Sequence, residues 1–128
     1  MTMIFGIGTD IVEYARIEKM FARYGGRLAE RLLSERELSE YQCCANPARL
    51  LAKRFAAKEA FAKAVGSGLR EPVSLRRVAI THDSLGKPEL QFDETLRIHL
   101  AQLGISGHHL SISDERDFIV AFVVLETG

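Results

Sequence analysis

Two carboxylates lie in segments that are otherwise apolar, where each could bind a metal ion. Asp10 interrupts a nearly continuous apolar, β-branched run from Ile4 to Val12. An ionised carboxylate in a buried strand must be paired, hydrogen-bonded or bound to a metal. The segment Asp10-Ile11-Val12-Glu13 also fits a capping box for a helix that follows. Taken alone, this segment favours neither the metal ligand nor the helix cap.

Glu59 stands on the predicted core-facing side of a long helix. One stripe of that helix, at the spacing i, i+4, i+8 and i+11, consists of Leu51, Phe55, Glu59 and Ala62. The alternative role is an i,i+4 ion pair with Lys63, worth only about 0.2 to 0.5 kcal/mol on an exposed helix. That gain is small against the cost of desolvating a carboxylate, so we favour a functional role for Glu59.

Two half-buried carboxylates without accompanying His or Cys suit a hard cation. Mg²⁺ in particular is often held by one or two carboxylates together with substrate phosphates. Arg54, Lys58 and Lys63 come from the same helix as Glu59 and supply positive charge for phosphates. The helix runs into Gly66-Ser67-Gly68, where backbone without side chains can approach a pyrophosphate. Glycine after a helix is usually only a C-cap. The inference of a phosphate site therefore rests on the carboxylates, the basic side chains and the glycines together.

Three helices in the first half would position these residues. Apolar side chains recur at helical spacing over Tyr14–Tyr24, and Gly25-Gly26 supplies a stop. A capping box, Ser34-Glu35-Arg36-Glu37, predicts a short helix that runs toward Cys43. Asn46 and Pro47 suit the N-cap and first position of the longest helix, which continues to Val65 before Gly66.

The second half of the chain changes to strand periodicity. Its predicted elements are a hairpin with strands at Val78–His82 and Leu90–Phe92, a short helix at Leu96–Leu103, and strands at His109–Ser113 and Phe118–Leu125. The last strand is apolar enough to be central, and the first, at Ile4–Val12, has the character of a strand buried on both faces. The order β-α-α-α-β-β-α-β-β predicts an α+β fold with helices packed on a mainly antiparallel sheet.

Composition limits the architecture and the partners. With 128 residues, the chain is expected to form one domain over residues 1–128. It has no apolar run of membrane-spanning length and no signal-peptide pattern, which favours the cytoplasm. Its two cysteines, Cys43 and Cys44, are adjacent, and this excludes a disulfide or zinc scaffold.

Charge is balanced overall but unevenly distributed. There are 17 basic and 17 acidic residues, which argues against wholesale binding to nucleic acid or an anionic membrane. Residues 14–63 nevertheless hold 11 basic and 6 acidic side chains, a net charge of +5, and the remainder carries −5. A basic surface for an acidic partner or a phosphate ligand is therefore expected.

The segments Gly6–Glu13 and Lys53–Ala64 resemble the two signature motifs of the holo-acyl-carrier-protein synthases. These are the small bacterial branch of the 4'-phosphopantetheinyl transferases. Gly66–Gly68, Leu85–Pro88 and His109–Ser113 match further motifs in order, so the resemblance covers essentially the whole chain. At one position the chain departs from the pattern, because many members have His where this chain has Asp114.

This resemblance implies the 4'-phosphopantetheinyl transferase fold and a specific reaction. The group transferred is 4'-phosphopantetheine, from coenzyme A to a serine hydroxyl of apo-acyl carrier protein, with release of adenosine 3',5'-bisphosphate, in support of fatty acid biosynthesis. Asp10 and Glu59 would hold Mg²⁺, and Lys63 would act with them in catalysis. The serine proton would pass to Glu59 or to a water on the metal. The residues implied along coenzyme A are Arg54, Lys58, Lys63, Gly66, Ser67, Gly68, Gly86, Lys87, Pro88, His109 and Ser111.

A basic stripe would serve the carrier protein. It follows the first helix, and continues past its glycine stop if the helix persists, through Arg16, Lys19, Arg23 and Arg27. The alternative is a solvated helix face. Carriers in this family are acidic and dock on the corresponding helix, and Arg16 best matches the docking arginine. Family members also form homotrimers with sites between subunits, and a neighbour's sheet would cover part of the Phe118–Leu125 strand, which is apolar on both faces.

The sequence patterns also suit two other classes of protein. A small nucleic-acid-binding module would use the basic stripe on phosphates and would tolerate the loss of Glu59. Zero net charge and the absence of Trp weigh against it. A catalytically silent interaction subunit would use Asp10 only as a cap and Glu59 only as an ion pair, and it would not bind coenzyme A.

Overall fold

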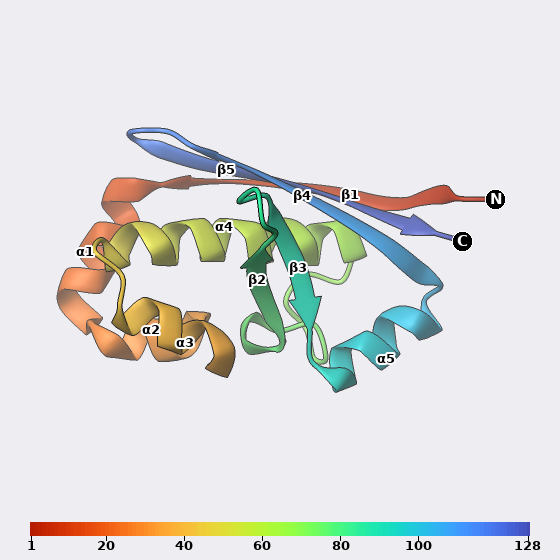
Figure 1. Ribbon diagram of the computed structural model, residues 1–128, viewed down its shortest axis with the longest axis horizontal. Coiled ribbons are helices and arrows are strands. Elements are labelled where there is room, and N and C mark those ends of the chain that lie inside the picture. The colour runs from red at the N-terminus through yellow and green to blue at the C-terminus, as the bar shows by residue number, and fades with distance from the viewer.

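A long helix, α4, lies between a three-stranded sheet and an outer layer of shorter elements (Figure 1). The computed structural model describes residues 1–128. The first half contains β1 (Met3–Glu13), α1 (Tyr14–Tyr24), α2 (Gly26–Leu32), α3 (Glu35–Gln42) and α4 (Pro47–Val65). The second half contains a short 3₁₀ turn η1 (Leu75–Arg77), β2 (Val78–His82), β3 (Pro88–Phe92), α5 (Glu94–Gln102), β4 (Ile105–Asp114) and β5 (Phe118–Thr127).

All strand pairs are antiparallel and fall into two sheets. The larger sheet has the order β1-β5-β4, and the smaller one is the β2-β3 hairpin. The prediction that the last strand is central is therefore confirmed, and so is the α+β class. None of the helices has the length and apolar character needed to cross a membrane.

Local signals in the sequence set the ends of α3 and α4. Ser34 and Glu37 form the predicted capping box of α3. In α4, the Asn46 side chain accepts a hydrogen bond from the Arg49 N–H, and Pro47 occupies the first turn. The helix ends at Val65, and its C-cap Gly66 has a left-handed φ of 96°, which favours glycine. Most of α4 is buried, since alanines let it pack between the two layers.

Two glycines of β1 allow the strand to lie directly on α4. A Cβ at Gly8 would come within 2.0 Å of the Ala60 carbonyl oxygen, and one at Gly6 within 2.1 Å of the Ala64 oxygen. No side chain fits at such distances. The close approach brings the end of β1, with Asp10, over the middle of α4.

We expect Gly8→Ala to destabilise the protein by about 1 to 3 kcal/mol, the usual cost of overpacking a core. The added methyl group would push β1 away from α4. The matched control is Gly26→Ala in α2, where the added methyl group would meet no atom within 4 Å, so this substitution is expected to increase stability. Thermal unfolding measures both, and equal melting temperatures for the two variants would contradict the packing argument.

Two predictions about these elements are wrong. The first strand is not buried on both faces: β1 is an edge strand, and Ile7 and Ile11 are 58% and 64% exposed. The reason is that α4 covers only one face of the sheet. The stop predicted at Gly25-Gly26 is confirmed, since α1 ends at Tyr24, but the predicted number of helices is wrong: α2 begins at Gly26, so four helices rather than three precede the hairpin.

The open face of the large sheet is the face that no helix covers. Directly opposed residues of antiparallel strands share a face, and the register assigns the apolar part of this one to Ile7, Ile11, Val120, Phe122 and Val124. Ile119, Ala121, Val123 and Leu125 alternate with them and are buried toward α4. The expectation that the last strand is apolar on both faces is thus met, with only one face covered.

Candidate active site

Asp10, Glu59 and Lys63 meet where β1 crosses α4. The Lys63 ammonium donates hydrogen bonds to Asp10 Oδ1 at 3.0 Å and to the Thr9 carbonyl oxygen at 2.9 Å. Asp10 and Glu59 line a hollow of about 760 Å³ that is bounded by β1, α1, α2 and α4 and is mostly apolar, with Phe55 on its wall. The structure therefore brings together the three residues expected to be catalytic.

The structure removes one alternative role for each carboxylate. Asp10 is not a helix cap, because β1 continues to Glu13 and Glu13 is the N-cap of α1. Glu59 forms no ion pair with Lys63, whose ammonium contacts Asp10 instead. Neither structural alternative accounts for the carboxylate concerned.

The carboxylates of Asp10 and Glu59 repel each other, and a cation bound between them would relieve this repulsion. Burial raises the pKa of Glu59, the nearby charge of Asp10 raises it further, and Lys63 opposes them. The two carboxylates thus interact unfavourably, and the Lys63 ammonium offsets part of this interaction. No group of three or more His, Cys, Asp or Glu side chains gathers anywhere in the chain, so a metal here would have two protein carboxylates and would need other oxygen ligands.

A second, smaller hollow lies on the other side of α4. It measures about 170 Å³, and its walls come from α4, the β2-β3 hairpin and the end of β4: Lys53, Arg54, His82, Gly86, Pro88, Ile112 and Asp114. The Arg54 guanidinium forms ion pairs with Glu37 and Glu40. Asp114 forms an ion pair with Arg49, at a distance of 2.5 Å. Lys87 and His109 line a neighbouring hollow of about 130 Å³ with Pro88.

Some of the expected coenzyme residues do not face Asp10 and Glu59. His109 and Ser111 are paired with Val124 and Phe122, which puts them on the open face. Asp10 is paired with Ala121 on the opposite face, toward α4. A single chain therefore divides the expected site between the two faces of its sheet.

Lys58 does not reach either hollow. Its side chain is completely buried, and its ammonium donates to the Leu32 and Leu75 carbonyl oxygens at 2.7 and 2.9 Å and to Glu37 at 2.5 Å. Burial lowers the pKa of Lys58 to about 8, although Glu37 opposes this shift. All three ammonium hydrogens are used inside the protein, so the expected coenzyme contact is not available to Lys58 in this structure.

The glycine-rich segment after α4 is a helix cap in this structure. The N–H groups of Gly66 and Gly68 both donate to the Ala62 carbonyl oxygen, and Ser67 Oγ donates to the Gly68 oxygen. The two glycine N–H groups are therefore already bonded.

The basic residues expected to dock a partner separate into two helices. Arg16 and Lys19 line the same hollow as Asp10 and Glu59. Arg27 does not continue their stripe, because α1 ends at Tyr24 and the chain turns at Gly25. The stripe predicted for a persistent helix is therefore interrupted before Arg27.

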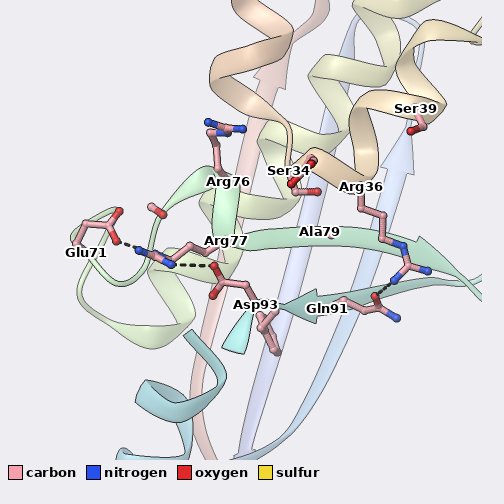
Figure 2. Close-up of a pocket in the computed structure, with 12 residues that line it drawn as sticks. Ser34, Arg36, Ser39, Glu71, Arg76, Arg77, Ala79, Gln91 and Asp93 are labelled. Carbon is pink, nitrogen blue, oxygen red and sulfur yellow. Dashed lines mark hydrogen bonds and ion pairs between the residues drawn. The ribbon is translucent and has the colours of Figure 1, made fainter. Parts of the chain in front are cut away.

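A further hollow of about 810 Å³, between α3 and the hairpin, was not foreseen from the sequence (Figure 2). Three of its charged groups pair with one another, since Arg77 pairs with Glu71 and Asp93, each at 2.8 Å, and Arg36 bonds the neutral side chain of Gln91. It contains none of the catalytic candidates.

Comparison with known proteins identifies the family. The family model described as "4'-phosphopantetheinyl transferase superfamily" matches residues 6–123 of this chain. The chain belongs to this family. It is 54% identical over 124 residues to the holo-acyl-carrier-protein synthase of Nitrosospira multiformis, in an alignment that spans 97% of this chain and 99% of that protein. The homologue from Laribacter hongkongensis is 55% identical with the same coverage.

Solved structures of family members share the fold. The holo-acyl-carrier-protein synthase of Neisseria meningitidis superposes with a TM-score of 0.93 at 51% identity, covering 96% of this chain and 98% of that one. The synthase of Bacillus anthracis, solved in complex with CoA (3',5'-ADP), gives a TM-score of 0.81 at 39% identity, covering 98% and 99%. The predicted fold and enzyme class, and the resemblance from which they came, are confirmed.

Proposed function

We propose that this enzyme transfers 4'-phosphopantetheine from coenzyme A to a serine hydroxyl of an apo-acyl carrier protein. The other product would be adenosine 3',5'-bisphosphate, and the holo-carrier would serve fatty acid biosynthesis. The convergence of Asp10, Glu59 and Lys63 carries the proposal, and the names of the relatives support it. Phosphoryl transfer asks a protein mainly for positioning and charge neutralisation, which these three side chains can supply.

The carboxylate pair fits Mg²⁺. Asp10 and Glu59 provide two hard oxygen ligands, and Mg²⁺ usually completes its shell with water and substrate phosphates. When bound, Mg²⁺ would neutralise charge on the coenzyme pyrophosphate. Lys63 would keep Asp10 oriented and donate to the phosphoryl oxygens. Glu59, or a water held by the metal, would accept the proton of the serine hydroxyl.

The remaining residues would hold the coenzyme, but two neighbouring chains would have to contribute them. We assign the nucleotide to Arg54, Gly86, Lys87, Pro88, His109 and Ser111, with Gly66, Ser67 and Gly68 near the phosphates. The small hollow and the open face hold most of these residues, away from Asp10. A homotrimer in which the open face of one subunit meets its neighbour would bring both parts together and cover the apolar strands.

Mass spectrometry of the carrier tests the proposal. The protein is incubated with apo-carrier, coenzyme A and Mg²⁺, and we expect the carrier to gain the mass of one 4'-phosphopantetheine group. Omission of coenzyme A or addition of a chelator gives the control. A carrier of unchanged mass under all conditions would contradict the proposed function.

We expect Arg16→Glu to weaken use of the carrier about tenfold or more while coenzyme binding stays unchanged. Arg16 borders the hollow that contains Asp10, and its charge suits an acidic partner. KM for the carrier at two salt concentrations and calorimetry with coenzyme A measure the two effects. The matched control is Arg97→Glu on the exposed face of α5. Equal loss of carrier and coenzyme binding would contradict the docking role.

A further inference from the structure

Glu37 is a buried carboxylate with four hydrogen-bond donors, and it joins α3, α4 and β2. Its Oε1 accepts hydrogen bonds from the Ser34 N–H at 2.9 Å and the Lys58 ammonium at 2.5 Å. Its Oε2 accepts from the Arg54 guanidinium and from the Ile80 N–H, both at 3.1 Å. The side chain is 2% exposed. Capping of α3, the role predicted from the sequence, uses only one of these four bonds.

The two bonds to Oε2 connect one wall of the small hollow with the strand that leads to another wall. Arg54 belongs to the α4 wall. Ile80 belongs to β2, which leads through His82 to Gly86 and Pro88 on the hairpin wall. One oxygen atom therefore fixes the spacing between the guanidinium and the hairpin.

We propose that Glu37 is a positioning residue for the coenzyme, because its Oε2 holds Arg54 and the β2-β3 hairpin at the spacing that the nucleotide requires. This inference rests on the proposed function, which assigns Arg54 and the hairpin loop to coenzyme A. Arg54 lines the small hollow and Glu37 does not, so Glu37 itself would not touch the nucleotide. It would act entirely through Arg54 and β2.

The chemistry of the site explains why a carboxylate is needed. All four partners of Glu37 are donors, so both oxygens must be acceptors. Burial raises the pKa of Glu37, but the charge of Lys58 and the hydrogen bonds from Lys58, Ser34 and Ile80 outweigh it and leave the pKa below its ordinary value. The group is therefore ionised at neutral pH and balances part of the charge of Arg54 and Lys58.

A second contact between α3 and the hairpin lies nearer the surface. Figure 2 shows Arg36 reaching from α3 to Gln91 on β3, beside Ala79 of β2. This contact can keep α3 and the hairpin associated when Glu37 is changed. Arg54 also keeps its bonds to Glu40, at 2.9 and 3.0 Å. A change at Glu37 should thus alter the spacing of the hollow without removing either wall.

The test compares Glu37→Gln with the wild-type enzyme. We expect KM for coenzyme A and the calorimetric dissociation constant of coenzyme A to rise about tenfold, the effect of one lost hydrogen bond to a charged group. KM for the apo-carrier should stay within about twofold of the wild-type value. The matched control is Glu35→Gln, on the same helix but exposed and without a side-chain partner. Circular dichroism and thermal unfolding show whether each variant is folded.

A second variant keeps the test decisive if Glu37→Gln does not fold. Glu37→Asp retains the buried charge but is too short to reach all four donors, so KM for coenzyme A should again rise while KM for the carrier does not. Unchanged coenzyme binding in whichever variant is folded would overturn the proposal. An equal rise in both KM values would overturn it too, since it would indicate general loosening.

A double-mutant cycle with Arg54→Gln tests whether Glu37 acts through Arg54. Coupled residues give non-additive effects, so the double variant should lose less coenzyme A affinity than the product of the two single losses, and the loss that remains beyond Arg54→Gln is the part that acts through β2. If the effects of the two single substitutions on coenzyme A binding simply multiply in the double variant, the proposed coupling between Glu37 and Arg54 is refuted. The wild-type enzyme is assayed in parallel: if it neither binds coenzyme A nor modifies the carrier, the proposed function fails, whereas normal wild-type activity with an unaffected Glu37 variant refutes only the role of Glu37.

Discussion

Glu59→Gln is expected to lower phosphopantetheine transfer by about a hundred- to a thousandfold in a protein that stays folded. Removing one group that stabilises charge in a transition state typically costs that much. The amide preserves the shape of the side chain, so its packing beside Phe55 is retained. It cannot carry the negative charge that Mg²⁺ requires, and it cannot accept the serine proton as a carboxylate does. The carrier mass as a function of time measures the loss.

Three comparisons make this result interpretable. Asp10→Asn should show a loss of similar size, because it removes the other carboxylate of the pair. Glu30→Gln, an exposed glutamate on α2, should leave transfer and folding unchanged. Isothermal titration with Mg²⁺ and coenzyme A should show weaker binding only for the two site variants. Near-normal turnover by folded Glu59→Gln would refute the assignment of Glu59 as a metal ligand.

Residues of the candidate site could be predicted from the sequence where a charged residue interrupts an apolar segment. Glu59 is conspicuous because it interrupts the apolar stripe of its helix, and Asp10 because it interrupts an apolar strand. Lys58 and Glu37 give no such signal. In the sequence, Lys58 resembles one more cation of a basic helix, and Glu37 resembles half of a capping box. Their pairing across 21 residues of sequence depends on how α3 packs against α4, which periodicity does not report.

The fold was predictable to a similar extent and for related reasons. Caps and turns are local, so the ends of α3 and α4 and the hairpin register follow from a few neighbouring residues. Burial is not local. The apolar run of β1 indicates that both of its faces need cover, but not whether a helix of the same chain or another subunit provides it. In this chain α4 covers one face and leaves Ile7 and Ile11 exposed on the other.

Phe122→Asp should convert the enzyme into an inactive monomer. Phe122 lies in the middle of the open face, between Thr9 and Ser111 in the register, and is 40% exposed in the single chain. Exposed apolar patches of this kind are typical of interfaces between proteins. A carboxylate buried there without a partner would cost about 3 to 5 kcal/mol in each subunit. Since each 1.4 kcal/mol is a factor of about ten in a dissociation constant, assembly should weaken more than about a hundredfold.

Activity should disappear together with assembly, because each chain places Asp10 and His109 on opposite faces of its sheet. Light scattering over a dilution series, with transfer assayed at the same concentrations, measures both quantities. The matched control is Ile98→Asp, which places the same charge at a 53% exposed apolar residue on α5, outside the open face. This variant should change neither assembly nor activity. A fully active Phe122→Asp monomer would refute the shared site. A wild-type dimer that loses activity on dissociation would contradict only the number of subunits, since the division of the site between the two faces of the sheet would still require a neighbour.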